Sequence, residues 1–136
     1  MIEMGSGTQS EMDPLTGGII GGLIEVHRHL GAGLLESSYA KAVGYELRNR
    51  HYDVELEVPV NVYYKGLNLG YSYRLDLLIN GMVIIELKTV EFLHEVHQAQ
   101  TLTYLKFGRI QYPQISRALL VNFNAKVLKG NIQRFI

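Results

Sequence analysis

The stretch that decides the fold is Tyr71-Ser-Tyr-Arg-Leu-Asp-Leu-Leu-Ile-Asn-Gly-Met-Val-Ile-Ile-Glu-Leu-Lys88. Apolar and polar side chains alternate on both sides of an Asn-Gly dipeptide, which is a strong signal for a β-hairpin. The alternation places Leu75, Leu77 and Ile79 on one face of the first strand. We therefore predict two antiparallel strands over about residues 69–79 and 83–88.

The register of this hairpin decides whether its two carboxylates meet. A strict two-residue turn would put Asp76 and Glu86 on opposite faces of the sheet. A three-residue loop or a β-bulge instead pairs Leu77 with Ile85 and matches the apolar faces, so we predict that register. Asp76 then lies opposite Glu86, with the two Cβ atoms ~5 Å apart.

Two carboxylates this close repel each other, so one must be protonated or a cation must lie between them. Hard oxygen ligands at this spacing suit Mg²⁺ or Mn²⁺. Lys88 follows Glu86 on the same face and could orient a water or stabilise negative charge on a phosphate. The alternative is a ladder of ion pairs between Asp76, Arg74, Glu86 and Lys88 on a solvated sheet face, and spacing alone leaves it open.

The rest of the chain predicts helices and further strands around this hairpin. Residues 1–12 are rich in Gly, Ser and Thr and lack periodicity, so we expect a disordered tail followed by a single domain over 13–136. The order α-α-β-β-β-α-β-β predicts an α/β fold in which a central sheet is flanked by helices. The other elements are expected over about residues 13–30, 34–50 and 93–107 for helices and 54–62, 118–122 and 127–135 for strands.

Two local patterns add to this outline. Glycines recur four apart in the first helix, at Gly17/Gly21 and Gly18/Gly22, which lets another backbone approach closely. That neighbour is either a helix of the same chain or a second copy, so a homodimer stays open. Pro59 predicts an edge position or a bulge for its strand.

Composition excludes several classes of protein. The chain has 136 residues and no cysteine, which excludes a disulfide framework, thiol catalysis and thiolate metal sites and fits a reducing cytoplasm. The apolar stretch over 17–24 is far shorter than the ~20 residues that cross a bilayer, so we expect no membrane segment. The 13 basic and 13 acidic residues balance, yet no acidic residue follows Glu95. The C-terminal third is therefore expected to be basic, as a solvated surface or a phosphate-binding face.

Two further groups of residues could reach the carboxylates. Glu36 and Tyr39 lie three apart on one helix face, and Gln100 and Tyr104 lie four apart on a later helix. These side chains could bind substrate or position a water beside the sheet. The alternatives are a first-turn acid favoured by the helix dipole and ordinary packing with a polar tip. His94 and His97 have metal-ligand spacing, but no third ligand lies nearby in the sequence.

The motifs taken together resemble the GxxExxY protein family. Its signature corresponds to Gly33-Leu-Leu-Glu36-Ser-Ser-Tyr39, and the similarity extends from about Leu15 to the C-terminus. The further motifs that resemble the family are Val26–Gly31, Tyr63–Gly66, Tyr73–Leu78, Ile85–Lys88 and Gln100-x-x-x-Tyr104-Leu105. The chain departs from the usual pattern at Leu75 and Ala32, where proline is common.

That family is grouped with the PD-(D/E)XK nuclease superfamily, so the resemblance implies a central mixed sheet flanked by helices and a nuclease activity. It implies that Asp76, Glu86 and Glu36 are metal ligands and that Lys88 is the catalytic lysine. Gln100 and Tyr104 would correspond to a Gln-x-x-x-Tyr motif that contacts substrate, and Tyr39 is expected beside them.

We therefore expect a Mg²⁺- or Mn²⁺-dependent phosphodiesterase acting on nucleic acid, with DNA as the favoured substrate. The alternative is a non-catalytic nucleic-acid-binding or partner-docking module on the same fold. A protein partner such as a helicase stays open.

Overall fold

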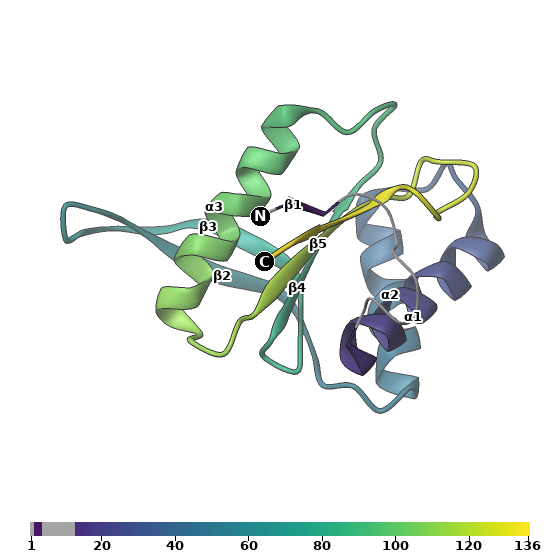
Figure 1. Cartoon of the computed structure of the whole chain (residues 1–136), viewed down its shortest axis with the longest axis horizontal. Helices are drawn as coiled ribbons and strands as arrows, with labels where there is room; N and C mark the ends of the chain where they lie inside the picture. The colour runs from purple at the N-terminus through teal and green to yellow at the C-terminus, as the bar shows by residue number, and fades with distance from the viewer. Residues whose placement is uncertain (1, 4–12) are drawn as a thin grey trace.

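The computed structural model describes residues 2–3 and 13–136, which form a six-stranded mixed sheet with helices on both faces (Figure 1). The strand order is β1-β6-β5-β4-β3-β2; β4 and β5 are parallel, and all other neighbours are antiparallel. The predicted α/β fold with a central mixed sheet is confirmed. The elements are β1 (Ile2–Glu3), α1 (Pro14–Leu30), α2 (Glu36–Asn49), β2 (Val54–Tyr64), β3 (Leu67–Ile79), β4 (Val83–Lys88), α3 (Glu95–Gln111), β5 (Arg117–Asn122) and β6 (Ile132–Phe135).

The predicted disordered tail falls mostly outside the described residues. Ile2 and Glu3 are described, and they pair with β6. Pro59 lies in β2, the strand at the other edge of the sheet, as its missing N–H predicts. Within the described residues, no helix combines the length and the apolar character that crossing a bilayer requires.

Helix α1 begins where its sequence predicts and packs against its own chain. The Oδ1 atom of Asp13 accepts a hydrogen bond from the backbone N–H of Thr16 (2.8 Å), which caps the helix. A Cβ atom on Gly22 would lie 2.6 Å from Cδ2 of Leu47 in α2. The small residues of α1 therefore admit the side chains of α2 and the loop after it. The close neighbours of Gly18, Gly21 and Gly22 are therefore side chains of the same chain.

Two hydrophobic clusters lie on the two faces of the sheet. Helices α1 and α2 cover one face, where Leu23, Tyr39 and Phe123 are fully buried. Helix α3 covers the other face, where Ile84 and Leu120 are fully buried. Each such side chain stabilises the fold by roughly 1.5–3 kcal/mol through burial, so both helical layers hold the sheet rigidly.

The predicted register of the β3–β4 hairpin is confirmed. Leu77 pairs with Ile85, and Ile79 pairs with Val83, which leaves a three-residue loop over 80–82. The backbone at Asn80 has a φ of +53°, a left-handed conformation that asparagine tolerates. The register therefore follows the matching of apolar faces and not the two-residue turn that the Asn-Gly dipeptide would form.

The predicted common face of Leu75, Leu77 and Ile79 is wrong. Leu77 and Ile79 pack under α1 and α2, whereas Leu75 packs under α3. Both strands of the β2–β3 pair change face at the level of Asp76. Leu56 pairs with Leu77 and Val58 with Leu75, but no pair is formed at the intervening level, where Glu57 has a φ of +50°.

Two predicted boundaries are also wrong. Helix α3 continues beyond Gly108 to Gln111, because this glycine lies in the helix interior and admits Ile115. A Cβ atom there would lie 3.2 Å from Cδ1 of Ile115. The last strand covers only Ile132–Phe135, since residues 123–131 form turns instead of extended chain.

Candidate active site

The carboxylates of Asp76 and Glu86 lie where strands β3 and β4 part. The backbone N–H of Asp76 donates to Oε1 of Glu86 (3.1 Å), and the N–H of Leu87 donates to Oδ2 of Asp76 (2.8 Å). Each carboxylate therefore takes a backbone donor from the opposite strand. The backbone pairing between β3 and β4 ends at Leu77 and Ile85, one residue before Asp76 and Glu86 are reached. At Asp76 and Glu86 the two strands are joined by backbone-to-carboxylate hydrogen bonds instead.

Burial makes this pair electrostatically costly. Glu86 is only 3% exposed, and burial together with the adjacent Asp76 charge raises the pKa of its carboxyl well above the usual value. Burial also raises the pKa of Asp76, and the nearby Glu36 charge raises it further. The N–H donor from Leu87 and the Lys88 ammonium oppose that rise. The protein thus holds two like charges in a low-dielectric setting that favours a bound proton or a cation.

Lys88 and Gln100 meet on the α3 side of the sheet. The Nζ atom of Lys88 donates to Oε1 of Gln100 (3.2 Å), which joins the end of β4 to the first half of α3. The ammonium charge is close enough to lower the pKa of both Asp76 and Glu86. Gln100 therefore directs the lysine, and the predicted ladder of ion pairs is absent among the salt bridges of residues 13–136.

Glu36 reaches the site from the first turn of α2. Its Oε2 atom accepts hydrogen bonds from the N–H and hydroxyl of Thr89, just after Lys88 (3.2 and 3.4 Å). A cavity of about 370 Å³ opens beside it and is also lined by Asp76, Lys41 and Glu57. Glu36 and Asp76 therefore face one solvent-filled space, although the hydrogen bonds of Glu36 go to the chain after β4.

The three acids do not form a closed ligand set. Within residues 2–3 and 13–136, no group of three or more His, Cys, Asp or Glu side chains has the arrangement of a metal site. Asp76 and Glu86 nevertheless fit a hard divalent cation by their chemistry. They are adjacent, Glu86 is buried and Asp76 is partly exposed, and a cation beside them would offset the burial and the Asp76 charge that raise the pKa of Glu86.

Tyr104 and Tyr39 have different surroundings. Tyr104 is 8% exposed, and burial raises the pKa of its hydroxyl to about 12, with further contributions from Glu86 and Asp76. Its ring also packs on that of Tyr73, with ring centroids 5.6 Å apart. Tyr39 is fully buried, stacks on Phe123 with ring centroids 4.6 Å apart, and donates its hydroxyl to the carbonyl of Gly31. The prediction that Tyr39 contacts substrate is therefore contradicted, because the ring anchors the loop between α1 and α2.

His94 and His97 pair with each other at the start of α3. The backbone N–H of His94 donates to Nδ1 of His97 (2.9 Å), so this ring caps the helix. Burial and the Lys88 charge lower the pKa of His97.

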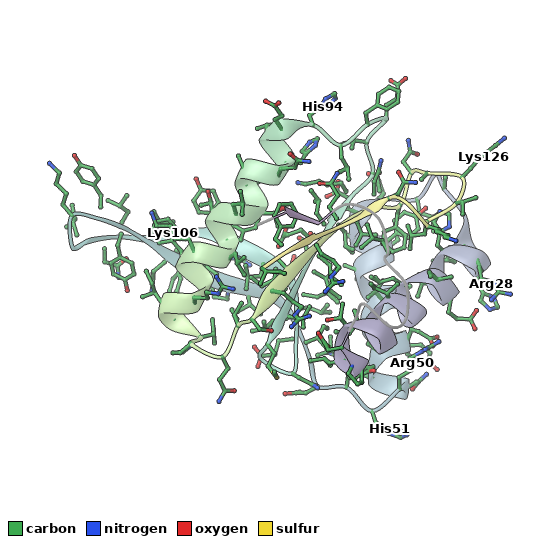
Figure 2. All side chains as sticks on the ribbon, viewed as in Figure 1. Arg28, Arg50, His51, His94, Lys106 and Lys126 are labelled. Carbon is green, nitrogen blue, oxygen red and sulfur yellow. The ribbon has the colours of Figure 1, made fainter. Side chains whose placement is uncertain are left out.

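The basic residues after Glu95 do not gather on one face of the molecule. They are Lys106, Arg109, Arg117, Lys126, Lys129 and Arg134. Arg109 donates to the carbonyls of Ile115 and Ser116, Arg117 pairs with Asp13, and Arg134 is 5% exposed. Figure 2 shows Lys106 on α3 at one side of the molecule and Lys126 at the other. The alternative of one phosphate-binding face is therefore not supported, whereas the exposed Lys106, Lys126 and Lys129 agree with a solvated surface.

Asn122 is a site residue that sequence reasoning missed. It is 3% exposed and pairs with Lys88 across the parallel strands. Its side-chain amide donates to the carbonyl of Val90 and its Oδ1 atom accepts from the N–H of Val90, so it fixes the chain after β4. An asparagine at the end of an apolar strand was the available signal.

A comparison of the sequence with protein-family models identifies the class of protein that has this mixed sheet, these paired carboxylates and the adjacent lysine. The profile of the PD-(D/E)XK nuclease superfamily matches residues 13–135, and the chain belongs to this superfamily. No curated protein sequence and no solved structure matches the chain significantly.

Proposed function

We propose that this protein is a nuclease that hydrolyses phosphodiester bonds in nucleic acid, with DNA as its favoured substrate. The observation that carries the proposal is the Asp76–Glu86 pair, in which each carboxylate accepts a backbone N–H from the opposite strand and Glu86 is buried beside the Asp76 charge, so that a cation is favourable at this point. Superfamily membership supports nucleic acid as the substrate. We further propose that the chain belongs to the GxxExxY branch and acts in the cytoplasm.

In this proposal Asp76 and Glu86 would hold Mg²⁺ or Mn²⁺, and Glu36, whose carboxylate accepts hydrogen bonds from Thr89, would be the third ligand. Once bound, the ion would polarise the scissile phosphate and lower the pKa of an attacking water. Lys88, directed by Gln100, orients that water or balances negative charge on the phosphate. Tyr104, one turn of α3 after Gln100, would contact the same phosphate.

A cleavage assay tests the proposal. The wild-type chain is incubated with Mg²⁺ or Mn²⁺ and with labelled single-stranded DNA, duplex DNA or RNA. Glu86→Gln keeps the size and the acceptor oxygen of the side chain but removes its charge, and we expect cleavage to fall about 100-fold or more. Glu55→Gln is the matched control, because Glu55 is an exposed acid of the same sheet, on β2. Equal cleavage by wild type and Glu86→Gln would contradict the proposal that the Asp76–Glu86 pair is the active site.

One observation favours a non-catalytic binding module as the second candidate. Glu36 is engaged by Thr89, and the described residues contain no three-ligand metal group. Mn²⁺ binding measured by calorimetry separates the two candidates. Binding that disappears in Asp76→Ala supports the nuclease, whereas no binding to the wild type together with intact DNA binding supports the module.

A further inference from the structure

The β2–β3 hairpin extends beyond the sheet as a long two-stranded arm (Figure 1). We call residues 58–75 the tyrosine arm, because four of its side chains are exposed tyrosines. Tyr64 and Tyr71 are 60% and 68% exposed, and Tyr63 and Tyr73 are each 37% exposed. Large aromatic side chains in solvent at this density mark a surface that binds something.

The charge of the tyrosine arm restricts what it binds. Lys65 and Arg74 are its charged residues, and no acidic residue occurs between Glu57 and Asp76. The Nζ atom of Lys65 lies 5.4 Å from the centre of the Tyr64 ring, so a cation and an aromatic face are presented together at the tip. Positive charge interleaved with aromatic rings is the composition of surfaces that bind unpaired nucleic acid.

The backbone of the arm disfavours a second copy as the occupant. The β2–β3 ladder shifts register between Val60 and Asn61 and again between Asn61 and Tyr63. Pro59 lies on the outer strand, and Gly70 has a φ of +92°. Such irregularities and an edge proline prevent another strand from adding to a sheet edge.

The base of the arm is held against α3 and adjoins the carboxylates. Gln111 in α3 bonds to the backbone of Pro59 and Asn61. The ring of Tyr73 packs on that of Tyr104 with centroids 5.6 Å apart, and Tyr104 follows Gln100, which bonds to Lys88, by one turn of α3. An aromatic path therefore runs from the exposed arm to the candidate active site.

We propose that the tyrosine arm binds a single nucleic-acid strand by stacking its unpaired bases on Tyr64 and Tyr71, with Lys65 and Arg74 contacting phosphates. The inference rests on the proposed function, since it names the strand that the nuclease would take. Bases offer their flat faces to a protein ring only when they are not stacked within a duplex. A strand held in this way would pass Tyr73 and arrive at Tyr104, next to the carboxylates.

Fluorescence anisotropy in EDTA tests binding without cleavage. The probes are a labelled 16-nucleotide single-stranded DNA, the same sequence as RNA, and the corresponding duplex DNA. We expect the wild type to bind a single strand more tightly than the duplex. Tyr64→Ala and Tyr71→Ala should each weaken single-strand binding at least about fivefold, and Tyr64→Phe and Tyr71→Phe should retain it, because phenylalanine keeps the stacking face.

Tyr45→Ala is the matched control, since Tyr45 is 69% exposed on α2, away from the arm. Its binding should equal that of the wild type, and circular dichroism should show all variants folded. Duplex binding as tight as single-strand binding, or unchanged binding by both alanine variants, would overturn the proposal. A dimer in light scattering that the arm variants dissociate would also overturn it, by assigning the arm to a second copy.

The two proposals fail separately. Strand binding that depends on Tyr64 and Tyr71 without any metal-dependent cleavage supports the arm and contradicts the nuclease. Cleavage that depends on Glu86, with strand binding indifferent to both tyrosines, supports the nuclease and contradicts the arm.

Discussion

The buried charge of Glu86 predicts that the metal-free protein gains stability when that charge is removed. Glu86 is 3% exposed, and its pKa in the folded state is raised above the unfolded value by burial and by the Asp76 charge. The folded state therefore binds more protons than the unfolded state between these two pKa values. By proton linkage, the free energy of unfolding falls as the pH rises from about 4.5 through the folded pKa.

Glu86→Gln removes this cost while keeping the local contacts. The amide oxygen can still accept the N–H of Asp76, and the amide nitrogen can donate to the Asp76 carboxylate. Each unit of pKa elevation corresponds to about 1.4 kcal/mol once the wild-type carboxyl ionises. We expect Glu86→Gln to be more stable than the wild type by about 1 kcal/mol or more near pH 8, and equal to it below pH ~4.

Thermal unfolding in EDTA followed by circular dichroism measures this difference. An increase of 1 kcal/mol should raise the Tm by about 3–5 °C for a domain of this size. Added Mn²⁺ should then reverse the order, because an ion at 100 times its Kd stabilises the wild type by about 2.7 kcal/mol and the variant far less. A variant less stable than the wild type at pH 8 in EDTA would refute the reasoning that Glu86 is a destabilising buried charge.

Four further substitutions test the packing and the backbone, each by thermal or urea unfolding. Gly22→Ala should destabilise the protein by about 1 kcal/mol, because the new Cβ atom would lie 2.6 Å from Cδ2 of the fully buried Leu47. Gly21→Ala should be neutral or stabilising, because its Cβ atom would meet only the end of the Arg50 side chain. Equal effects of the two substitutions would contradict this packing. Asp13→Ala should cost about 1 kcal/mol by removing the cap of α1. Burial alone would raise the pKa of Asp13, but its hydrogen bonds lower it, so this cost should be present at pH 7 and disappear as the pH falls below 3.8. Glu57→Gly should stabilise the fold by up to about 1 kcal/mol, because glycine adopts a φ of +50° without strain, and a marked loss of stability would contradict that account.

The hairpin register was predictable because its apolar pattern admits one solution. A slip of one residue between β3 and β4 would have moved Val83 and Ile85 to the face of Asp76. The same reasoning brought Asp76 and Glu86 together, and the structure places them in contact through the backbone of the opposite strand. The alternation of apolar and polar residues also sufficed to predict the bounds of β4, with Lys88 at its end.

The change of face at Asp76 was not predictable from alternation. It depends on a left-handed backbone at Glu57, and glutamate carries no local preference for that conformation. The burial of Tyr39 depends on Phe123, which lies far away in the sequence. The arginines of the C-terminal third were read as surface charge, but Arg117 finds Asp13 at the start of α1. Partners brought together by the tertiary fold leave no trace in local periodicity.

The site and the tyrosine arm have a common structural origin in the length of β3. Strand β4 has 6 residues and β3 has 13, so β3 has β4 as a neighbour only in its second half. Where the two strands part, the N–H groups of Asp76 and Leu87 bond to carboxylates instead of carbonyls. Those bonds favour ionised carboxylates while burial disfavours them, and a bound cation reconciles the two demands. From the same point toward its start, β3 has only β2 as its neighbour in the sheet and becomes the arm. Because one continuous strand carries both Tyr71 and Asp76, the distance between a base stacked on the arm and the carboxylates is set by β3 itself rather than by a flexible loop.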